Sequence, residues 1–184
     1  MEKKYLVRKK YYLLRKKKYY EISKNFFTPL VNFIKKKFKK KNFKLALYYP
    51  SSFEINVLKF LEFNFISNSN LLLPVIEENN QMNFFSWKKN EVLQINKYGI
   101  LEPIKSKPSI PDIMLIPLLA FDKNKYRLGY GKGFYDRYLD RYLKKFKNII
   151  SIGVAFSFQE YHKLPISNKD VKLDYIISEK GIYQ

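Results

Sequence analysis

The feature that most constrains the fold is a nearly unbroken apolar run followed by a glycine-rich turn and an amphipathic segment. The run DIMLIPLLAF (112–121) is typical of a strand that is covered on both faces, as in parallel sheets. The segment FYDRYLDRYLKKF (134–146) repeats an aromatic residue every four positions, which predicts a helix with one apolar face. A strand followed by a helix in this way predicts α/β layers.

Strands and helices are expected to alternate along the rest of the chain. Apolar stretches predict strands at 44–49, 71–76, 82–87, 149–156 and 173–178. Helical periodicity predicts helices at 3–20, 24–40 and 54–63. We expect Ser23 to cap the second of these helices, and the segment 96–103 to be a loop.

This alternation predicts a three-layer α/β sandwich with a central, largely parallel mixed sheet flanked by helices. The sequence has no internal repeat and no linker. We therefore expect residues 1–184 to form a single domain.

Composition excludes several kinds of site. The 184 residues contain no cysteine, which rules out disulfides, thiolate zinc sites and a thiol nucleophile. The single histidine, His162, cannot support a multi-histidine metal site. The sequence has no apolar run long enough for a membrane span and no signal-peptide pattern at its start. We expect no membrane partner and a cytoplasmic location.

The net charge of +20 raises nucleic acid as a partner. However, 31 of the 36 basic residues are lysine, and Asn, Ile, Phe and Tyr are also abundant. This bias is typical of drift in an AT-rich genome, and arginine is the better phosphate ligand where geometry matters. We expect no obligate nucleic-acid partner and keep nucleic-acid binding as the alternative function.

The segment RLGYGKGFYDRYL (127–139) contains three of the six glycines in the chain. A glycine turn that opens a helix lets backbone N–H groups approach a phosphate, and the helix N-terminus adds partial positive charge. Arg127 and Lys132 add full charges, and Asp136 is placed to hold a magnesium ion that bridges phosphates. The spacing matches neither the P-loop nor the dinucleotide fingerprint. A plain tight turn is the alternative explanation.

The longer segment PDIMLIPLLAFDKNKYRLGYGKGFYDRYL (111–139) resembles the signature region of the 5-formyltetrahydrofolate cyclo-ligase family, also called 5,10-methenyltetrahydrofolate synthetases. The resemblance continues, in order, with a K-x-x-x-R pair, YYPSSFE (48–54), GILEP (99–103) and LPISNKDVKLD (164–174). The chain departs from the family pattern at Leu118, where many members have glycine, and at Lys169, where histidine is common.

The resemblance implies ATP- and Mg²⁺-dependent cyclisation of 5-formyltetrahydrofolate to 5,10-methenyltetrahydrofolate, with release of ADP and phosphate through a phosphorylated formyl (iminium phosphate) intermediate. Such chemistry depends on positioning and charge neutralisation more than on a nucleophilic side chain. The implied partners are ATP and the folate, with or without a polyglutamate tail. The fold alone could also bind a nucleotide for another purpose.

The resemblance also assigns roles to residues. It places ATP against Lys4, Arg8, Arg127, Leu128, Gly129, Tyr130, Gly131, Lys132, Gly133, Phe134 and Tyr135. Lys132 and Arg127 are the implied catalytic residues, because they would offset charge on the transferred phosphoryl group. Asp136 and Asp174 would hold Mg²⁺. The implied folate contacts are Tyr49, Glu54, Tyr130 and Phe134.

Several of these residues have ordinary structural explanations. Lys4 and Arg8 share one helix face, which could simply be solvated. Asp174 could be a carboxylate at a strand edge, and Tyr49 could pack in the core. Phe134 suits the apolar face of its own helix.

Overall fold

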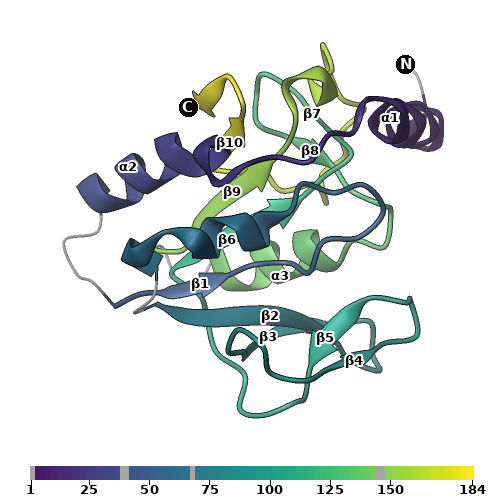
Figure 1. The fold of residues 1–184 in the computed structure, drawn as a ribbon. Helices are drawn as coiled ribbons and strands as arrows, with labels where there is room; N and C mark the ends of the chain where they lie inside the picture. The colour runs from purple at the N-terminus through teal and green to yellow at the C-terminus, as the bar shows by residue number, and fades with distance from the viewer. Residues whose placement is uncertain (1–2, 38–41, 67–68, 144–147) are drawn as a thin grey trace.

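The computed structural model describes residues 3–37, 42–66, 69–143 and 148–184. Its centre is a sheet of seven strands in the order β11-β10-β9-β6-β1-β2-β3 (Figure 1). The strands are β1 (Lys44–Ala46), β2 (Asn70–Ile76), β3 (Met82–Ser86), β6 (Ile113–Pro117), β9 (Ile150–Val154), β10 (Tyr175–Ser178) and β11 (Gly181–Tyr183). All neighbouring pairs are parallel except the two at the edges, β2–β3 and β10–β11. The predicted largely parallel mixed sheet is confirmed.

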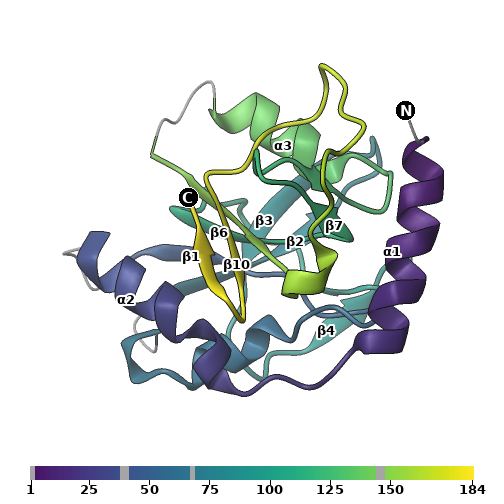
Figure 2. The same ribbon diagram turned by 90° about the horizontal axis from the view of Figure 1, so that it is seen from above.

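The two faces of the sheet bury separate apolar cores, because side chains alternate along each strand. Leu115 of β6 belongs to the core under α2 (Thr28–Lys37). Its neighbours Met114 and Ile116 belong to the core under α3 (Phe134–Leu143). Figure 2 shows α2 and α3 on opposite sides of the sheet. The predicted three-layer α/β arrangement is therefore present, whereas the single-domain assignment stays a prediction.

The N-terminal helix α1 (Lys4–Lys18) does not cover the sheet but packs at its margin (Figure 2). Its buried residues Val7 and Tyr11 form a third apolar cluster with the hairpin of β7 (Ala120–Phe121) and β8 (Arg127–Leu128). This packing brings α1 beside the glycine-rich turn, since that turn follows β8 directly.

The helical segments differ from the sequence predictions at their ends. The segment 24–40 begins as a 3₁₀ turn, η1 (Lys24–Phe27), and α2 starts only at Thr28, followed by a proline that suits a first helical turn. Ser23 makes no side-chain capping hydrogen bond, so its predicted role was wrong. Residues 38–40 and 144–146 of the predicted helices lie outside the described residues.

The predicted helix at 54–63 is a 3₁₀ helix, η2 (Val57–Glu62), followed by a second, η3 (Asn64–Ile66). A further 3₁₀ turn, η4 (Ser157–Gln159), follows β9. The predicted strand at 112–121 is divided, because β6 ends at Pro117 and β7 pairs with β8 in a separate sheet.

The prediction of a loop at 96–103 is confirmed for residues 96–100 and wrong for the last three. These form β5 (Leu101–Pro103), which pairs with β4 (Leu93–Ile95) as an antiparallel hairpin. The hairpin is held by polar contacts, since the buried Glu102 accepts hydrogen bonds from the Asn96 side chain and the Ile76 N–H. Because polar side chains hold this hairpin together, its sequence lacks the alternation of apolar residues that predicts a strand.

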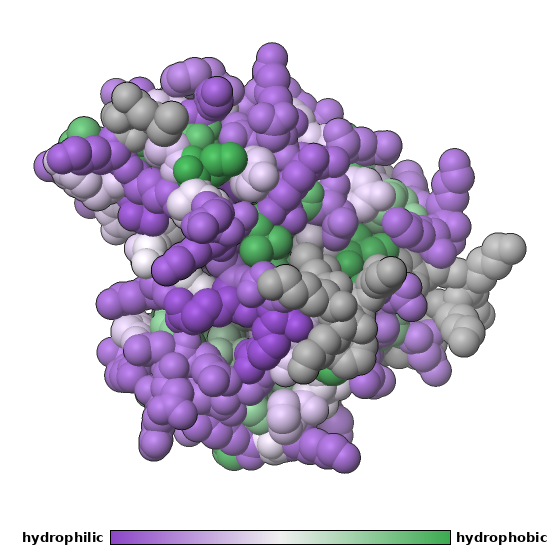
Figure 3. All heavy atoms as spheres, turned by 180° about the vertical axis from the view of Figure 1, so that it is seen from behind, coloured by the Kyte–Doolittle hydropathy of each residue, from purple (hydrophilic) through white to green (hydrophobic). Residues whose placement is uncertain are grey.

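The face shown in Figure 3 is covered mainly by hydrophilic residues, and apolar residues appear on it as small separate groups. This surface agrees with the lysine-rich composition. Within the described ranges, no helix combines the length and apolar character needed to cross a bilayer.

Gly153 of β9 offers a test of how closely the sheet packs against the core under α3. A Cβ atom at this position would lie 2.5 Å from Ile176 Cδ1 and 2.8 Å from Leu118 Cδ2. We expect Gly153→Ala to lower the free energy of unfolding by about 1–3 kcal/mol, because the core cannot accept the added methyl group. Urea denaturation measures this loss.

Ile176→Val provides the matched control, because it removes the nearest of the clashing atoms. The double variant Gly153→Ala/Ile176→Val should be more stable than the sum of the two single losses predicts. A Gly153→Ala protein as stable as the wild type would contradict the close packing of β9.

Candidate functional site

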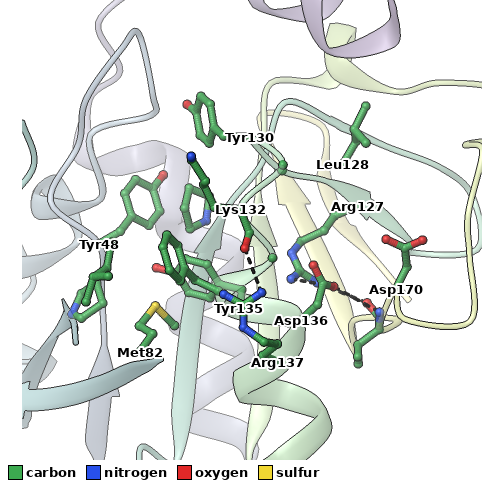
Figure 4. A pocket seen from close by; sticks show the side chains of 18 of the residues that line it. Tyr48, Met82, Arg127, Leu128, Tyr130, Lys132, Tyr135, Asp136, Arg137 and Asp170 are labelled. Carbon is green, nitrogen blue, oxygen red and sulfur yellow. Dashed lines mark hydrogen bonds and ion pairs between the residues drawn. The ribbon is translucent and has the colours of Figure 1, made fainter. Parts of the chain in front are cut away.

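A cavity of about 1050 Å³ opens at the carboxyl ends of the parallel strands (Figure 4). Residues that follow β1 and β8 line it, together with Pro117 at the end of β6 and residues from α1 and the β4–β5 hairpin. In doubly wound folds, this edge of the sheet is where ligands bind. The cavity is at the upper end of the range of about 300–1,000 Å³ found for small-molecule sites.

The glycine turn forms one wall of the cavity and requires glycine at two positions. Gly131 and Gly133 have φ angles of +102° and +69°, a region that other residues rarely adopt. A Cβ at Gly133 would also lie 2.9 Å from Arg137 Nη1. The α3 helix begins at the next residue, so its N-terminus adds partial positive charge to this wall.

The helix α1 holds the turn from the side. Arg8 Nε donates a 2.9 Å hydrogen bond to the carbonyl oxygen of Gly129, and its guanidinium lies under Gly131. Lys4 lies one turn before Arg8 and also lines the cavity. The structure therefore brings both basic residues of the predicted K-x-x-x-R pair to the cavity, and Arg8 contacts the glycine turn.

An ion pair between the buried Arg127 and the partly exposed Asp136 lies behind the turn. Arg127 Nη2 is 3.0 Å from Asp136 Oδ1, and Arg127 Nη1 donates to the Val171 carbonyl oxygen. Burial lowers the pKa of Arg127, and the nearby Asp136 carboxylate opposes this shift. Arginine is effectively always protonated in proteins, so the side chain stays charged at neutral pH.

A second carboxylate, Asp170, lies on the same side of the cavity (Figure 4). Its Oδ1 accepts a 2.7 Å hydrogen bond from Lys4 Nζ. Burial alone would raise the pKa of Asp170, but the hydrogen bonds from Lys4 and Ser167 outweigh it and lower the pKa. Asp170 is thus ionised at neutral pH and faces the same space as Asp136.

Asp174 is not brought to this cavity. Its Oδ2 accepts hydrogen bonds from the backbone N–H and the hydroxyl of Ser151, at 2.8 and 2.7 Å. These bonds join the chain just before β10 to β9. The segment DVKLD contains two aspartates, and the one that faces the cavity is Asp170, which the sequence analysis did not select.

The opposite end of the cavity contains a buried carboxylate. Glu54 is 7% exposed, and its Oε1 accepts a 2.8 Å hydrogen bond from the Tyr130 hydroxyl. Burial raises the pKa of Glu54, while hydrogen bonds from Ser51 and Tyr130 and the charge of Arg15 act in the lowering direction. Arg15 is a functional candidate that sequence reasoning missed, because it is followed by three lysines in a strongly basic helix.

The β4–β5 hairpin adds aromatic and apolar groups. Tyr98 lies in its turn and contacts Phe134, with ring centroids 5.8 Å apart. The ammonium of Lys132 lies 5.6 Å from the centre of the same Tyr98 ring. Tyr98 was not selected from the sequence, since its segment was predicted to be a featureless loop.

The residues predicted to contact ATP or folate all line this one cavity: Lys4, Arg8, Tyr49, Glu54, Arg127, Leu128, Gly129, Tyr130, Gly131, Lys132, Gly133, Phe134 and Tyr135. Among the described residues, no group of three or more acidic or histidine side chains is arranged around a common point. A metal would therefore take one or two carboxylates here, with its other ligands from substrate or water.

Comparisons with known proteins identify relatives of this chain. A family model described as the 5-formyltetrahydrofolate cyclo-ligase family matches residues 23–179. The chain is 33% identical to the 5-formyltetrahydrofolate cyclo-ligase of Haemophilus influenzae over 136 residues, which cover 70% of this chain and 72% of that protein. It is 36% identical to the cyclo-ligase of Mycoplasma genitalium over 137 residues, which cover 72% and 70%.

Solved structures show the same similarity. The 5,10-methenyltetrahydrofolate synthetase of Aquifex aeolicus matches with a TM-score of 0.76 at 28% identity, over 98% of this chain and 92% of that one. The synthetase of Mycoplasma pneumoniae matches with a TM-score of 0.70 at 28% identity, over 97% and 99%. This chain therefore belongs to the 5-formyltetrahydrofolate cyclo-ligase family of ligases.

Proposed function

We propose that the protein uses ATP and Mg²⁺ to cyclise 5-formyltetrahydrofolate to 5,10-methenyltetrahydrofolate, releasing ADP and phosphate. The observation that carries this proposal is the pairing, within one cavity, of a cationic glycine turn at a helix N-terminus with a buried carboxylate at the other end. The first feature suits a triphosphate and the second suits the donor groups of a pterin ring.

In the proposed reaction, the formyl oxygen attacks the γ-phosphorus and ADP leaves. N10 then attacks the formyl carbon, which is now part of an iminium phosphate. N10 loses its proton to solvent, and phosphate departs with the former formyl oxygen. Lys132 and Arg127 offset the charge on the transferred phosphoryl group, and Arg8 keeps the turn in place. No nucleophilic side chain is required.

The residues at the phosphate end fit a magnesium ion. Both protein contacts described for Asp136 are made by Oδ1, which leaves Oδ2 for a metal. Asp170 supplies a second carboxylate on the same side, where a metal would share its oxygens with Lys4 and Ser167. Asp174 is bound to Ser151 and is not among the cavity-lining residues. We propose Asp136 and Asp170 as the residues that hold Mg²⁺, which when bound would neutralise phosphate charge.

Glu54 and Tyr49 are proposed to bind the folate, together with Tyr130 and Phe134.

The absence of cysteine from the 184 residues supports action in a reducing compartment such as the cytoplasm.

The proposed reaction is tested by following the near-ultraviolet absorbance of the methenyl product. We expect a rise that requires both ATP and Mg²⁺, and a loss of at least about 100-fold in kcat/KM in Lys132→Ala and Asp136→Ala. Lys163→Ala, at an exposed position outside the cavity, is the control and should be unaffected. Product formation without ATP would contradict the proposal.

The metal assignment is tested by titrating Mg²⁺ against activity in three Asp→Asn variants. Asp136→Asn and Asp170→Asn should each raise the Mg²⁺ concentration needed for half-maximal rate, by roughly tenfold, because each removes a charged ligand. Asp174→Asn should lower the melting temperature and leave the Mg²⁺ requirement unchanged. If Asp174→Asn raised the Mg²⁺ requirement and Asp170→Asn did not, Asp174 and not Asp170 would be the second metal ligand.

We also expect the protein to prefer a folate that carries a polyanionic tail, because Lys4, Lys132 and Lys169 all line the cavity. We expect kcat/KM to be higher for a pentaglutamate than for a monoglutamate substrate at low salt, and the difference to shrink at high salt. Equal values at low salt would show that these lysines do not bind the tail.

A further inference from the structure

Arg15 is a buried arginine in the most basic part of α1. Its side chain is 1% exposed, whereas the three lysines that follow it are exposed. Burying a guanidinium is costly unless hydrogen bonds and charge partners compensate. The contacts of Arg15 therefore show which groups compensate for its burial and which parts of the structure it holds together.

The guanidinium joins three segments that are distant in the sequence. Nη1 donates a 3.0 Å hydrogen bond to the Leu118 carbonyl oxygen, just after β6. Nη2 donates to the Ser52 carbonyl oxygen at 2.7 Å and also to the Tyr130 hydroxyl. The arginine thus connects the end of β6, the loop after β1 and the glycine turn.

The connection continues to the carboxylate of the cavity. Tyr130 accepts from Arg15 and donates its own proton to Glu54 Oε1 at 2.8 Å. Because a tyrosine hydroxyl carries one proton, the bond from Arg15 fixes the direction in which Tyr130 donates. The guanidinium also lies 5.5 Å from the centre of the Tyr130 ring, which favours the same orientation.

The loop that presents Glu54 has an unusual backbone. Ser52 and Phe53 have φ angles of +49° and +65°, a region that non-glycine residues adopt only when their surroundings compensate. Arg15 binds the carbonyl oxygen of Ser52, and Tyr12 of the same helix packs on Phe53. The helix α1 therefore holds this loop in the conformation that directs Glu54 into the cavity.

We propose that Arg15 is a positioning residue for the folate end of the cavity, which acts by fixing the Tyr130 hydroxyl and the loop that carries Glu54. Arg15 is not among the cavity-lining residues, so it acts through these neighbours and not by touching substrate. The inference rests on the proposed function, in which Glu54 and the Tyr130 side chain contact the folate, and it assigns the Tyr130 hydroxyl to the folate although the family resemblance places this residue against ATP as well.

The test compares steady-state kinetics of wild type, Arg15→Gln, Arg15→Lys and Tyr130→Phe, with both substrates varied separately. We expect Arg15→Gln and Tyr130→Phe to raise the KM for 5-formyltetrahydrofolate roughly tenfold, while the KM for ATP stays within about twofold. Lys16→Gln, one residue along the same helix and exposed, is the matched control and should leave both KM values unchanged.

A second readout distinguishes positioning from loss of stability. The titratable or charged groups around Glu54 are Arg15, Tyr130, Tyr48 and Tyr135. Removing the Arg15 charge should raise the pKa of Glu54, so Glu54 takes up a proton at a higher pH than in the wild type. The acid limb of the profile of kcat/KM for the folate should move to higher pH in Arg15→Gln, and much less in Arg15→Lys, which keeps the charge.

Tyr130→Phe keeps the experiment decisive if Arg15→Gln does not fold, because it removes only the hydroxyl that links Arg15 to Glu54. The inference is overturned if the variants lower the melting temperature alone, or if they raise the KM of both substrates equally. A wild-type protein without cyclo-ligase activity would instead refute the proposed function.

Discussion

The burial of β6 on both faces is the constraint on which the rest of the structure depends. Residues 113–116 are at most 1% exposed, and the strand lies between β9 and β1 in the middle of the sheet. Parallel neighbours on both sides put their carboxyl ends at one edge. The glycine turn follows β6 through a short hairpin, so the core itself determines which edge of the sheet holds the cavity.

The cavity also depends on three basic residues of α1. Lys4 binds Asp170, Arg8 binds the Gly129 carbonyl oxygen, and Arg15 binds Tyr130. The first two support the phosphate end and the third supports the end that contains Glu54. One helix at the start of the chain thus organises both ends of a site whose other parts lie between 37 residues away, at Ser52, and 166 residues away, at Asp170.

The elements that sequence patterns predicted well are those whose stability comes from apolar burial. The strands of the central sheet and α3 follow from apolar runs and aromatic spacing, and the signature segment indicated the family. The predictions failed at the β4–β5 hairpin, which the buried Glu102 stabilises through hydrogen bonds. They also failed at η2, where a short segment adopts 3₁₀ geometry.

The sequence by itself determined the layered fold, the glycine turn that opens α3, and the residues predicted to contact ATP or folate, all of which line the cavity. Only the tertiary structure decided that Asp170 and not Asp174 faces this cavity, and that Arg15 is buried beside Tyr130. Both outcomes depend on where the backbone turns and on partners that are distant in the chain. A local pattern contains the residue types, but it does not contain the neighbours that decide whether a charge is exposed, paired or directed into a cavity.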